Sequence, residues 1–351
     1  MKKISYTLFI ISSLLIFPSC EKMVLGNDEA NDPENCFELL WNDFDQHYAT
    51  FTVKNIDWNT LYNEYRPLVN SATTEDELWH ILTGILEHLD DGHVTLVQPI
   101  SGANDRFFES GSTLNFEAEE EFDLDLIENS YLDYLKTTKD TDLSYGKVKH
   151  KDIGYIYLEG LGGDNPELID DIIDKLKSHK AIILDVRNNG GGQDTYAHRF
   201  AGAFADGEHF IYTVQTKTGP GHDEFDEKKK WYTRKEGDEQ YLKPVIFLTD
   251  RFTASAAEIL GFNMKAFAHV THMGDTTAGD HSDMSGYHFL PNGWVYSLAP
   301  QLYLTPEGEC LESIGLAPDI YTENTKEEIE SGIDNTLEEA IVFLFDEYGI
   351  E

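Results

Sequence analysis

Apolar residues recur every three or four positions in three segments near the start of the chain, the spacing of a helix with one buried face. These segments are 37–48, 58–65 and 78–89. Their apolar positions include large aromatic residues such as Phe44 and Trp58, which are far more often core than ligand site. We therefore expect a small N-terminal helical domain with an aromatic core.

From residue 153 onward the pattern changes, because short apolar runs now alternate with helical stretches. Uninterrupted apolar runs are typical of strands buried on both faces of a parallel sheet. The helical stretches are 165–179, 195–204 and 255–267, and a β-rich segment follows at 287–304. The fold class predicted is α/β, with a mostly parallel sheet in the core. A last helix should begin near Asp334 or Asn335.

The first residues read as a secretory signal. Lys2 and Lys3 precede an apolar stretch at 8–17 that is too short to span a membrane, and Cys20 follows. This order predicts a lipid on Cys20 and a lipid-anchored protein of the bacterial cell envelope, on the periplasmic or outer-membrane face. Signal cleavage without lipidation is the alternative.

These patterns suggest five divisions of the chain. They are a signal peptide (1–20), a tether (21–34), the N-terminal helical domain (35–98), a short acidic connecting region (99–150) and the α/β core with its C-terminal helix (151–351).

Acidic residues far outnumber basic ones. The 351 residues include 65 Asp and Glu against 26 Lys and Arg, a formal net charge of −39. Such a chain repels nucleic acid and anionic membrane surfaces, so neither is expected to bind it electrostatically. Beyond Cys20 the chain has Cys36 and Cys310, and an oxidising envelope permits a disulfide between them. The sequence leaves the paired and unpaired states open.

A serine stands where one apolar run gives way to a helix. The strand expected at 245–248 is followed by Ser255, and an alanine-rich helix begins there. A hydroxyl at a helix start faces unpaired backbone N–H groups, which can hold the oxyanion that develops in acyl transfer. The same residues form a capping box, with Ser255 as N-cap and Glu258 reaching back to it. The sequence leaves both roles of Ser255 open, that of a nucleophile and that of a helix cap.

Three glycines follow another apolar run. The strand expected at 181–186 leads into 190–192, and a helix follows. Glycine lets backbone N–H groups approach a substrate closely. A phosphate-binding loop is a rival interpretation, but a P-loop needs Lys and then Ser or Thr after its glycines, whereas Asp185 and Asp194 flank these. A plain tight turn also stays open.

Two further residues complete the candidate chemistry. His93 lies at the junction between the third front helix and the next strand, where it is either a hydrogen-bonded surface residue or a general base. Glu312 lies in the segment 311–320, and in so acidic a chain a single glutamate is not by itself evidence of a catalytic role. Serine needs a base to become a nucleophile, and imidazole serves best when a carboxylate orients it. An imidazole base would titrate near its ordinary pKa of about 6.5.

Taken in this order, these segments resemble the C-terminal-processing, or tail-specific, serine peptidase family, and within it the tricorn-type branch. The matching pieces are 91–93, 153–156, 185–192, 253–258 and 312–319. The resemblance implies a core like that of ClpP and crotonase. It also implies Ser255 as nucleophile, His93 as general base and Glu312 as the acidic partner.

The resemblance further implies an oxyanion hole, formed by the backbone N–H of Ala256 and that of Gly191 or Gly192. It implies a peptide or protein substrate, with the chain acting as an endopeptidase or a carboxyl-terminal processing peptidase. A non-catalytic ligand- or peptide-binding protein on the same fold is the alternative. The sequence does not fix the oligomeric state.

Several residues depart from the family pattern. The larger branch uses a lysine base where this chain has Asp280, so a Ser/Lys pair would have to use Lys265. Tricorn protease has a second serine where this chain has Gly92. The region 99–150 is short for an inserted PDZ domain, and no PDZ domain is recognisable in it.

Neither a metal nor another cofactor is expected. Four histidines lie close together in the sequence, but they lack the His-Glu-x-x-His spacing of a zinc protease. These are His269, His272, His281 and His288.

Overall fold

The computed structural model describes residues 30–99, 105–111, 121–138, 143–163 and 165–351. Cys20, the signal peptide and most of the tether therefore lie outside the described residues. Within the described ranges, none of the helices combines the length and the apolar composition that a membrane crossing requires.

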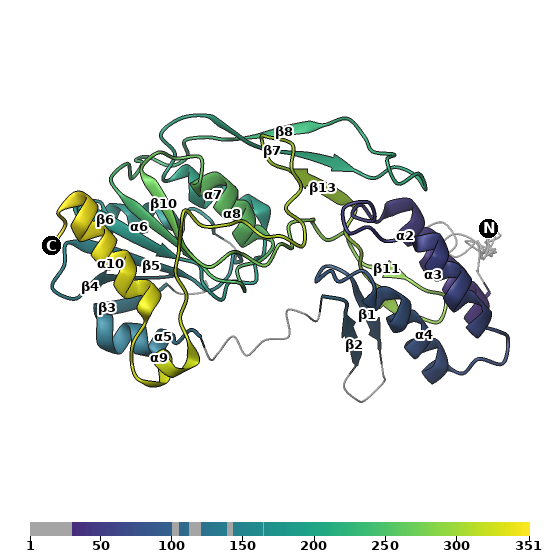
Figure 1. Cartoon of the computed structure of the whole chain (residues 1–351). Helices are drawn as coiled ribbons and strands as arrows, with labels where there is room; N and C mark the ends of the chain where they lie inside the picture. Colours follow the sequence, from purple (N-terminus) through teal and green to yellow (C-terminus); the bar gives the residue numbers. More distant parts are fainter. Residues whose placement is uncertain (1–29, 100–104, 112–120, 139–142, 164) are drawn as a thin grey trace, which may run out of the picture.

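Three helices pack against a small antiparallel sheet in the front part of the molecule, on the right of Figure 1. The helices are α2 (Pro33–His47), α3 (Trp58–Tyr65), followed by the short turn Arg66–Leu68, and α4 (Glu75–Glu87). They bury an aromatic core that includes Phe44 and Trp58, which confirms the predicted helices.

The sheet of this front part has the order β11-β12-β1-β2. Its strands are β1 (Thr95–Gln98), β2 (Arg106–Glu109), β11 (His288–Phe289) and β12 (Val295–Tyr296). Two of them come from the β-rich segment near the end of the sequence, so the chain returns to complete the front part. Tyr296 of β12 lies against Phe44 at a ring distance of 6.0 Å.

The central sheet has the strand order β14-β10-β9-β6-β5-β4-β3 within the described residues. The first five strands in this order run parallel, and β4 and β3 add antiparallel at one edge. The bounds are β3 Leu132–Thr137, β4 Leu143–Val148, β5 Ile153–Leu158, β6 Ala181–Asp185, β9 Val245–Thr249, β10 Val270–Gly274 and β14 Ile320–Tyr321. The largely parallel α/β core is therefore confirmed. Because β3 and β4 belong to the region 99–150, that region does more than connect.

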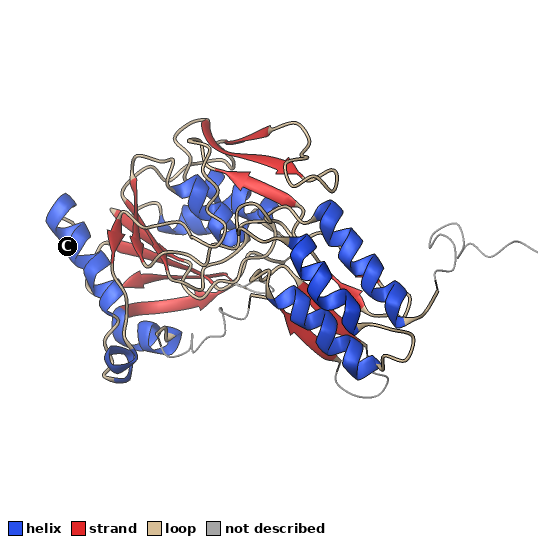
Figure 2. Ribbon diagram, turned by 45° about the vertical axis from the view of Figure 1, so that its right-hand side comes forward, coloured by secondary structure: helices blue, strands red, loops and turns tan. Residues whose placement is uncertain are grey.

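Helices cover both faces of this sheet (Figure 2). Side chains of β6 alternate, so that Ile182 and Leu184 pack with one helix layer and Ile183 with the other. The first layer contains α6 (Leu168–Leu176), α7 (Asp194–Gly202) and α8 (Ala256–Met264). The second layer contains α10 (Asn335–Tyr348), near the short elements α5 (Leu124–Leu126), Ile127–Tyr131 and α9 (Lys326–Glu330).

A third sheet, with the order β13-β7-β8, runs along the top of Figure 1. Its strands are β7 (His209–Thr216), β8 (Lys229–Thr233) and β13 (Gln301–Leu304). Among the described strands, β8 pairs only with β7, so its other edge is open.

A buried ion-pair network fixes the last helix to the sheet. Arg187 donates to Asp185 at the end of β6 and to Asp334, the N-cap of α10, at 2.9 and 2.8 Å. All three side chains are buried. Asp185 and Arg187 of the glycine motif therefore have a structural role. The two described cysteines, Cys36 and Cys310, are unpaired.

Candidate active site

Ser255 and His93 meet although they are far apart in the sequence. Ser255 is the N-cap of α8, and its Oγ lies 3.1 Å from Nε2 of His93. The backbone of Ser255 has φ 53° and ψ −125°, a strained conformation for a residue other than glycine. This sharp strand-to-helix turn is of the kind that presents a nucleophile. The predicted capping box with Glu258 is also present, so the two interpretations of Ser255 are compatible.

His93 lies in the turn between α4 and β1 of the front part. Its backbone N–H donates to Asp91 Oδ1 at 2.9 Å, and its carbonyl accepts from the Ser297 hydroxyl at 2.8 Å. Asp91 is itself buried and accepts from the hydroxyl of Tyr48 at 2.7 Å. The base is thus held by its own turn, by the end of α2 and by the segment that follows β12.

The carboxylate beside the imidazole belongs to Asp280. Asp280 Oδ1 lies 2.9 Å from Nδ1 of His93, on the ring side opposite Ser255. The resemblance implied Glu312 as the acidic partner that orients the catalytic residues, but no hydrogen bond or ion pair joins Glu312 to His93 among the described residues. Asp280 occupies the position that the resemblance assigned to a lysine base.

Glu258 holds the loop that carries Asp280. Its carboxylate is fully buried and accepts from the hydroxyl of Thr277 at 2.5 Å and from the amides of Gly279 and Asp280, each at 2.9 Å. It also accepts from the amide of Ser255 at 3.2 Å. One carboxylate therefore ties the nucleophile turn to the loop of its partner acid.

Glu312 supports the same loop from the other side. Its Oε2 accepts from the amides of His281 and Ser282 at 3.0 and 3.1 Å. Its Oε1 lies 3.8 Å from Nζ of Lys54, which is also 3.7 Å from Asp91 Oδ2 and donates to the carbonyl of Asp90 at 2.6 Å. The Lys54 side chain is only 7% exposed. A buried cation from the front part thus lies between two buried carboxylates.

These charges set the protonation of the site. Burial disfavours the imidazolium form, but the charge and contact of Asp280, with Asp91 and Glu312, outweigh burial and raise the pKa of His93 to about 10. Burial, together with the charges of Asp91 and Asp280, raises the pKa of Glu312 well above its ordinary value. The raised pKa of His93 favours a charged His93 in the resting site and differs from the ordinary pKa of about 6.5 that the sequence implies.

The predicted oxyanion donors lie at the nucleophile turn. A side chain on Gly191 would place its Cβ 2.7 Å from the Cβ of Ser255 and 2.9 Å from the amide nitrogen of Ala256, so only glycine fits. The N–H of Gly191 donates to the side chain of Asn189 at 2.8 Å. Among the described residues, the amides of Gly192 and Ala256 have no hydrogen-bond acceptor, and they are the donors that remain.

The lysine alternative is not supported by the geometry. Lys265 is the C-cap of α8, at the opposite end of the helix from Ser255, and its Nζ pairs with Asp319 at 2.7 Å. Metal ligation was not expected, but one group in the described residues has the geometry to hold an ion: Asp91, His93 and Asp280 offer ligand atoms within 4.8 Å of one another. These residues belong to the serine site, where Nδ1 of His93 already faces Asp280.

Comparison with known proteins identifies the family. The profile of peptidase family S41 matches residues 152–322, and that of the tricorn protease C1 domain matches residues 29–86. A crystal structure of a candidate peptidase from Parabacteroides merdae has a TM-score of 0.79 and 30% sequence identity, covering 90% of this chain and 97% of that chain. The chain belongs to peptidase family S41. This S41 peptidase is a serine-type hydrolase, as the sequence predicted.

More distant relatives agree. Carboxy-terminal processing protease CtpA of Bacillus subtilis is 22% identical to the S41 peptidase over 361 residues, which cover 90% of this chain and 75% of the relative. The crystal structure of the tricorn protease has a TM-score of 0.56 at 15% identity, covering 90% of this chain and 37% of that chain, and shows a shared fold.

Sequence reasoning missed three features of the S41 peptidase site. Asp280 stood out only as an acid in place of a lysine, although such a replacement could have indicated a partner for His93. The role of Glu258 beyond capping depends on a loop about twenty residues further on, as its bonds to Gly279 and Asp280 show. Lys54 carries no sequence signal.

Proposed function

We propose that this peptidase hydrolyses peptide bonds with Ser255 as nucleophile, His93 as general base and Asp280 as the carboxylate that orients the imidazole. The observation that carries the proposal is the continuous contact from Ser255 Oγ to His93 Nε2, at 3.1 Å, and from His93 Nδ1 to Asp280, at 2.9 Å. A base within hydrogen-bond reach of a serine and oriented by an acid is the geometry that activates a serine hydroxyl.

The steps follow from this geometry. Oγ of Ser255 attacks the scissile carbonyl carbon while its proton passes to Nε2 of His93. The tetrahedral oxyanion is held by the amides of Gly192 and Ala256. The carbon–nitrogen bond then breaks, and His93 gives its proton to the leaving amine. Water, deprotonated by His93, hydrolyses the acyl-enzyme and restores Ser255.

Glu312 acts in this scheme as a positioning residue. It accepts from the amides of His281 and Ser282, next to Asp280, and so fixes the loop that carries the partner acid of His93. No metal ion takes part in the proposed steps, so hydrolysis should survive exhaustive chelation.

Turnover of a diverse peptide library tests the proposal. The wild-type protein should cleave members of the library, Ser255→Ala should lower turnover by several orders of magnitude, and Ser331→Ala, on the surface next to α9, should not. The positions of cleavage would distinguish an endopeptidase from a carboxyl-terminal processing enzyme. A folded wild-type protein that cleaves no member would instead favour the non-catalytic binding protein.

We further propose that Cys20 carries a lipid that anchors the peptidase to the bacterial cell envelope. Its support is the order of Lys2, Lys3, the apolar stretch 8–17 and Cys20. Mass spectrometry of the mature N-terminus should find a diacylglyceryl group on Cys20. An unmodified Cys20, or its removal with the signal, would contradict the anchor.

A further inference from the structure

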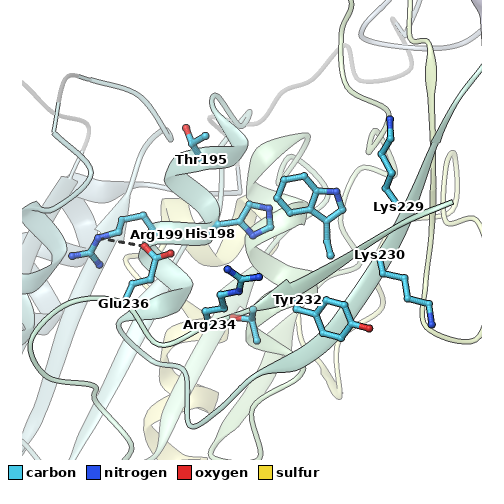
Figure 3. A pocket seen from close by; sticks show the side chains of 10 residues that line it. Thr195, His198, Arg199, Lys229, Lys230, Tyr232, Arg234 and Glu236 are labelled. Atoms are coloured by element: carbon cyan, nitrogen blue, oxygen red, sulfur yellow. Dashed lines mark ion pairs between the residues drawn. The ribbon is translucent and has the colours of Figure 1, made fainter. Parts of the chain in front are cut away.

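A pocket of about 620 Å³ opens between α7 and the open edge strand β8. In Figure 3, Thr195, His198 and Arg199 extend from the helix, and Lys229, Lys230, Tyr232 and Arg234 from the strand region. Thr195 follows Gly191 by only four residues, and Gly191 packs against Ser255. One end of the pocket is therefore near the nucleophile turn.

The pocket is cationic in a strongly acidic chain. Arg199, Lys229, Lys230 and Arg234 line it against a single carboxylate, Glu236, whereas the whole chain has 65 acidic and 26 basic residues. A cluster of positive charge on such a protein attracts anionic groups locally.

Two of the four cations are held by short ion pairs. Arg199 pairs with Asp170, and Lys229 lies 2.8 Å from Asp226. Nζ of Lys230, in contrast, lies 4.9 Å from the ring centre of Phe210, and Lys230 forms no ion pair with the described residues.

Arg234 has an ion-pair partner, but the pair is long and exposed. Its Nε lies 3.8 Å from Glu208, and the two side chains are 73% and 65% exposed, so a ligand carboxylate can replace Glu208 at little cost. Lys230 and Arg234 are four positions apart, so in an extended chain they share one face and are separated by about 13 Å.

The pocket also has an aromatic wall, because the side chain of Trp231 points to the side of the strand opposite Lys230 and Arg234 and meets His198 of α7. The rings of Trp231 and His198 stack at 5.1 Å with an angle of 5° between their planes, and Trp231 is 44% exposed. His198 Nε2 lies 2.9 Å from the hydroxyl of Tyr212, which places the ring against Trp231. Burial lowers the pKa of His198, so this wall is uncharged near neutral pH.

We propose that the open edge of β8 binds an extended acidic segment of the substrate polypeptide. The segment adds a strand to β8 through main-chain hydrogen bonds, as extended peptides do at exposed sheet edges. Its acidic side chains face Lys230 and Arg234, and its intervening apolar side chains face Trp231. This inference concerns how the proposed peptidase recognises substrates, and it rests on the proposed function only for the identity of the ligand as substrate.

Direct binding tests the surface without relying on catalysis. The probe is a fluorescein-labelled peptide of alternating Val and Glu, blocked at both ends, titrated by anisotropy against Ser255→Ala protein at low salt. A matched peptide with Gln in place of Glu should bind about tenfold more weakly, because exposed ion pairs each contribute modestly. Added salt should remove the difference.

Charge reversal locates the site. Lys230→Glu combined with Arg234→Glu should weaken binding of the Glu peptide about tenfold, and the two Gln substitutions should have an intermediate effect. The control is Lys136→Glu, since Lys136 is also an exposed lysine over an aromatic ring on an edge strand, in β3, and it should change nothing.

Three results would contradict the proposed binding of an acidic segment at the edge of β8. They are equal binding of the Glu and Gln peptides, equal loss of binding in the Lys136→Glu control, and binding of a Gln peptide with an unblocked carboxyl end that is as strong as binding of the blocked Glu peptide. In the wild-type protein, the acidic segment should lower KM and leave kcat unchanged. Absence of cleavage with binding intact would count against the proposed function alone.

Discussion

Ser255 and His93 approach each other from two regions that fix their side chains by different means. On the nucleophile side, backbone amides and a hydroxyl converge on one buried carboxylate, Glu258, and glycines allow close approach. On the base side, charged groups of the front part and of the core meet around the imidazole: Asp91, Asp280, Glu312 and Lys54. Hydrogen bonds from neutral donors to a carboxylate hold geometry, whereas ion pairs with the titrating group also set its protonation. The first region should therefore control stability, and the second should control how activity depends on pH.

Removing the charge next to the imidazole should have the largest effect. In Asp280→Asn the carboxylate that orients His93 is lost, and turnover should fall about 10³- to 10⁴-fold, as for the equivalent change in other serine enzymes. The matched change Glu312→Gln keeps an acceptor for the two backbone amides and should cost less than about tenfold. A larger loss in Glu312→Gln than in Asp280→Asn, measured as kcat in folded protein, would return the role of acidic partner to Glu312.

The second largest effect is expected in the pH dependence of kcat/KM. His93 must be neutral to accept the proton of Ser255, and its pKa is raised to about 10. The neutral fraction therefore increases as pH rises, and kcat/KM should climb through the neutral range towards about pH 10, by up to about tenfold per pH unit. A profile that levels off near pH 7 would show that the base-side charges do not act on His93 as described.

Changes on the nucleophile side should mainly lower the free energy of unfolding. Glu258→Gln replaces a carboxylate that accepts four donors, so unfolding free energy should fall by about 2–4 kcal/mol. Glu77→Gln is the control, because Glu77 closes an equivalent but exposed capping box on α4 and should lose only a few tenths of a kcal/mol. Chemical denaturation measures both. Equal losses of unfolding free energy in the two variants would show that Glu258 acts only as a helix cap.

The smallest expected effect is that of Lys54. Lys54→Met leaves Asp91 and Glu312 without their cation, so the proton on His93 should be held more tightly, and the pH profile should move towards alkaline pH by about one unit. At neutral pH this is a roughly tenfold loss of kcat/KM that should vanish at high pH. Lys54→Arg should restore most of it. A loss that is equal at every pH would indicate a structural role.

The sequence predicts the nucleophile side better than the base side, for physical reasons. The strand before Ser255, the glycines at 190–192 and the capping box are local patterns, and local patterns specify local structure. The partner of His93 depends on a loop after β10, and the carboxylate nearest in space is far away in sequence. Spacing alone therefore did not separate Asp280 from Glu312.

The front part shows the same limit. Its three helices follow from apolar periodicity, but its sheet needs β11 and β12 from residues 288–296, about two hundred positions after β1. Such non-local pairing leaves no periodic signal in the sequence of either partner. The buried cation Lys54 is likewise defined only by the fold, since an isolated lysine in a turn resembles any surface lysine.

The central claim is that Ser255 is an activated nucleophile. Labelling the purified protein with a fluorophosphonate and mapping the modified residue by tandem mass spectrometry tests it most directly. The label should be on Ser255, should form faster as pH rises, and should be absent from Ser255→Ala and strongly reduced in His93→Ala. A folded wild-type protein that stays unlabelled at every pH, or that is labelled on another residue, would contradict the account.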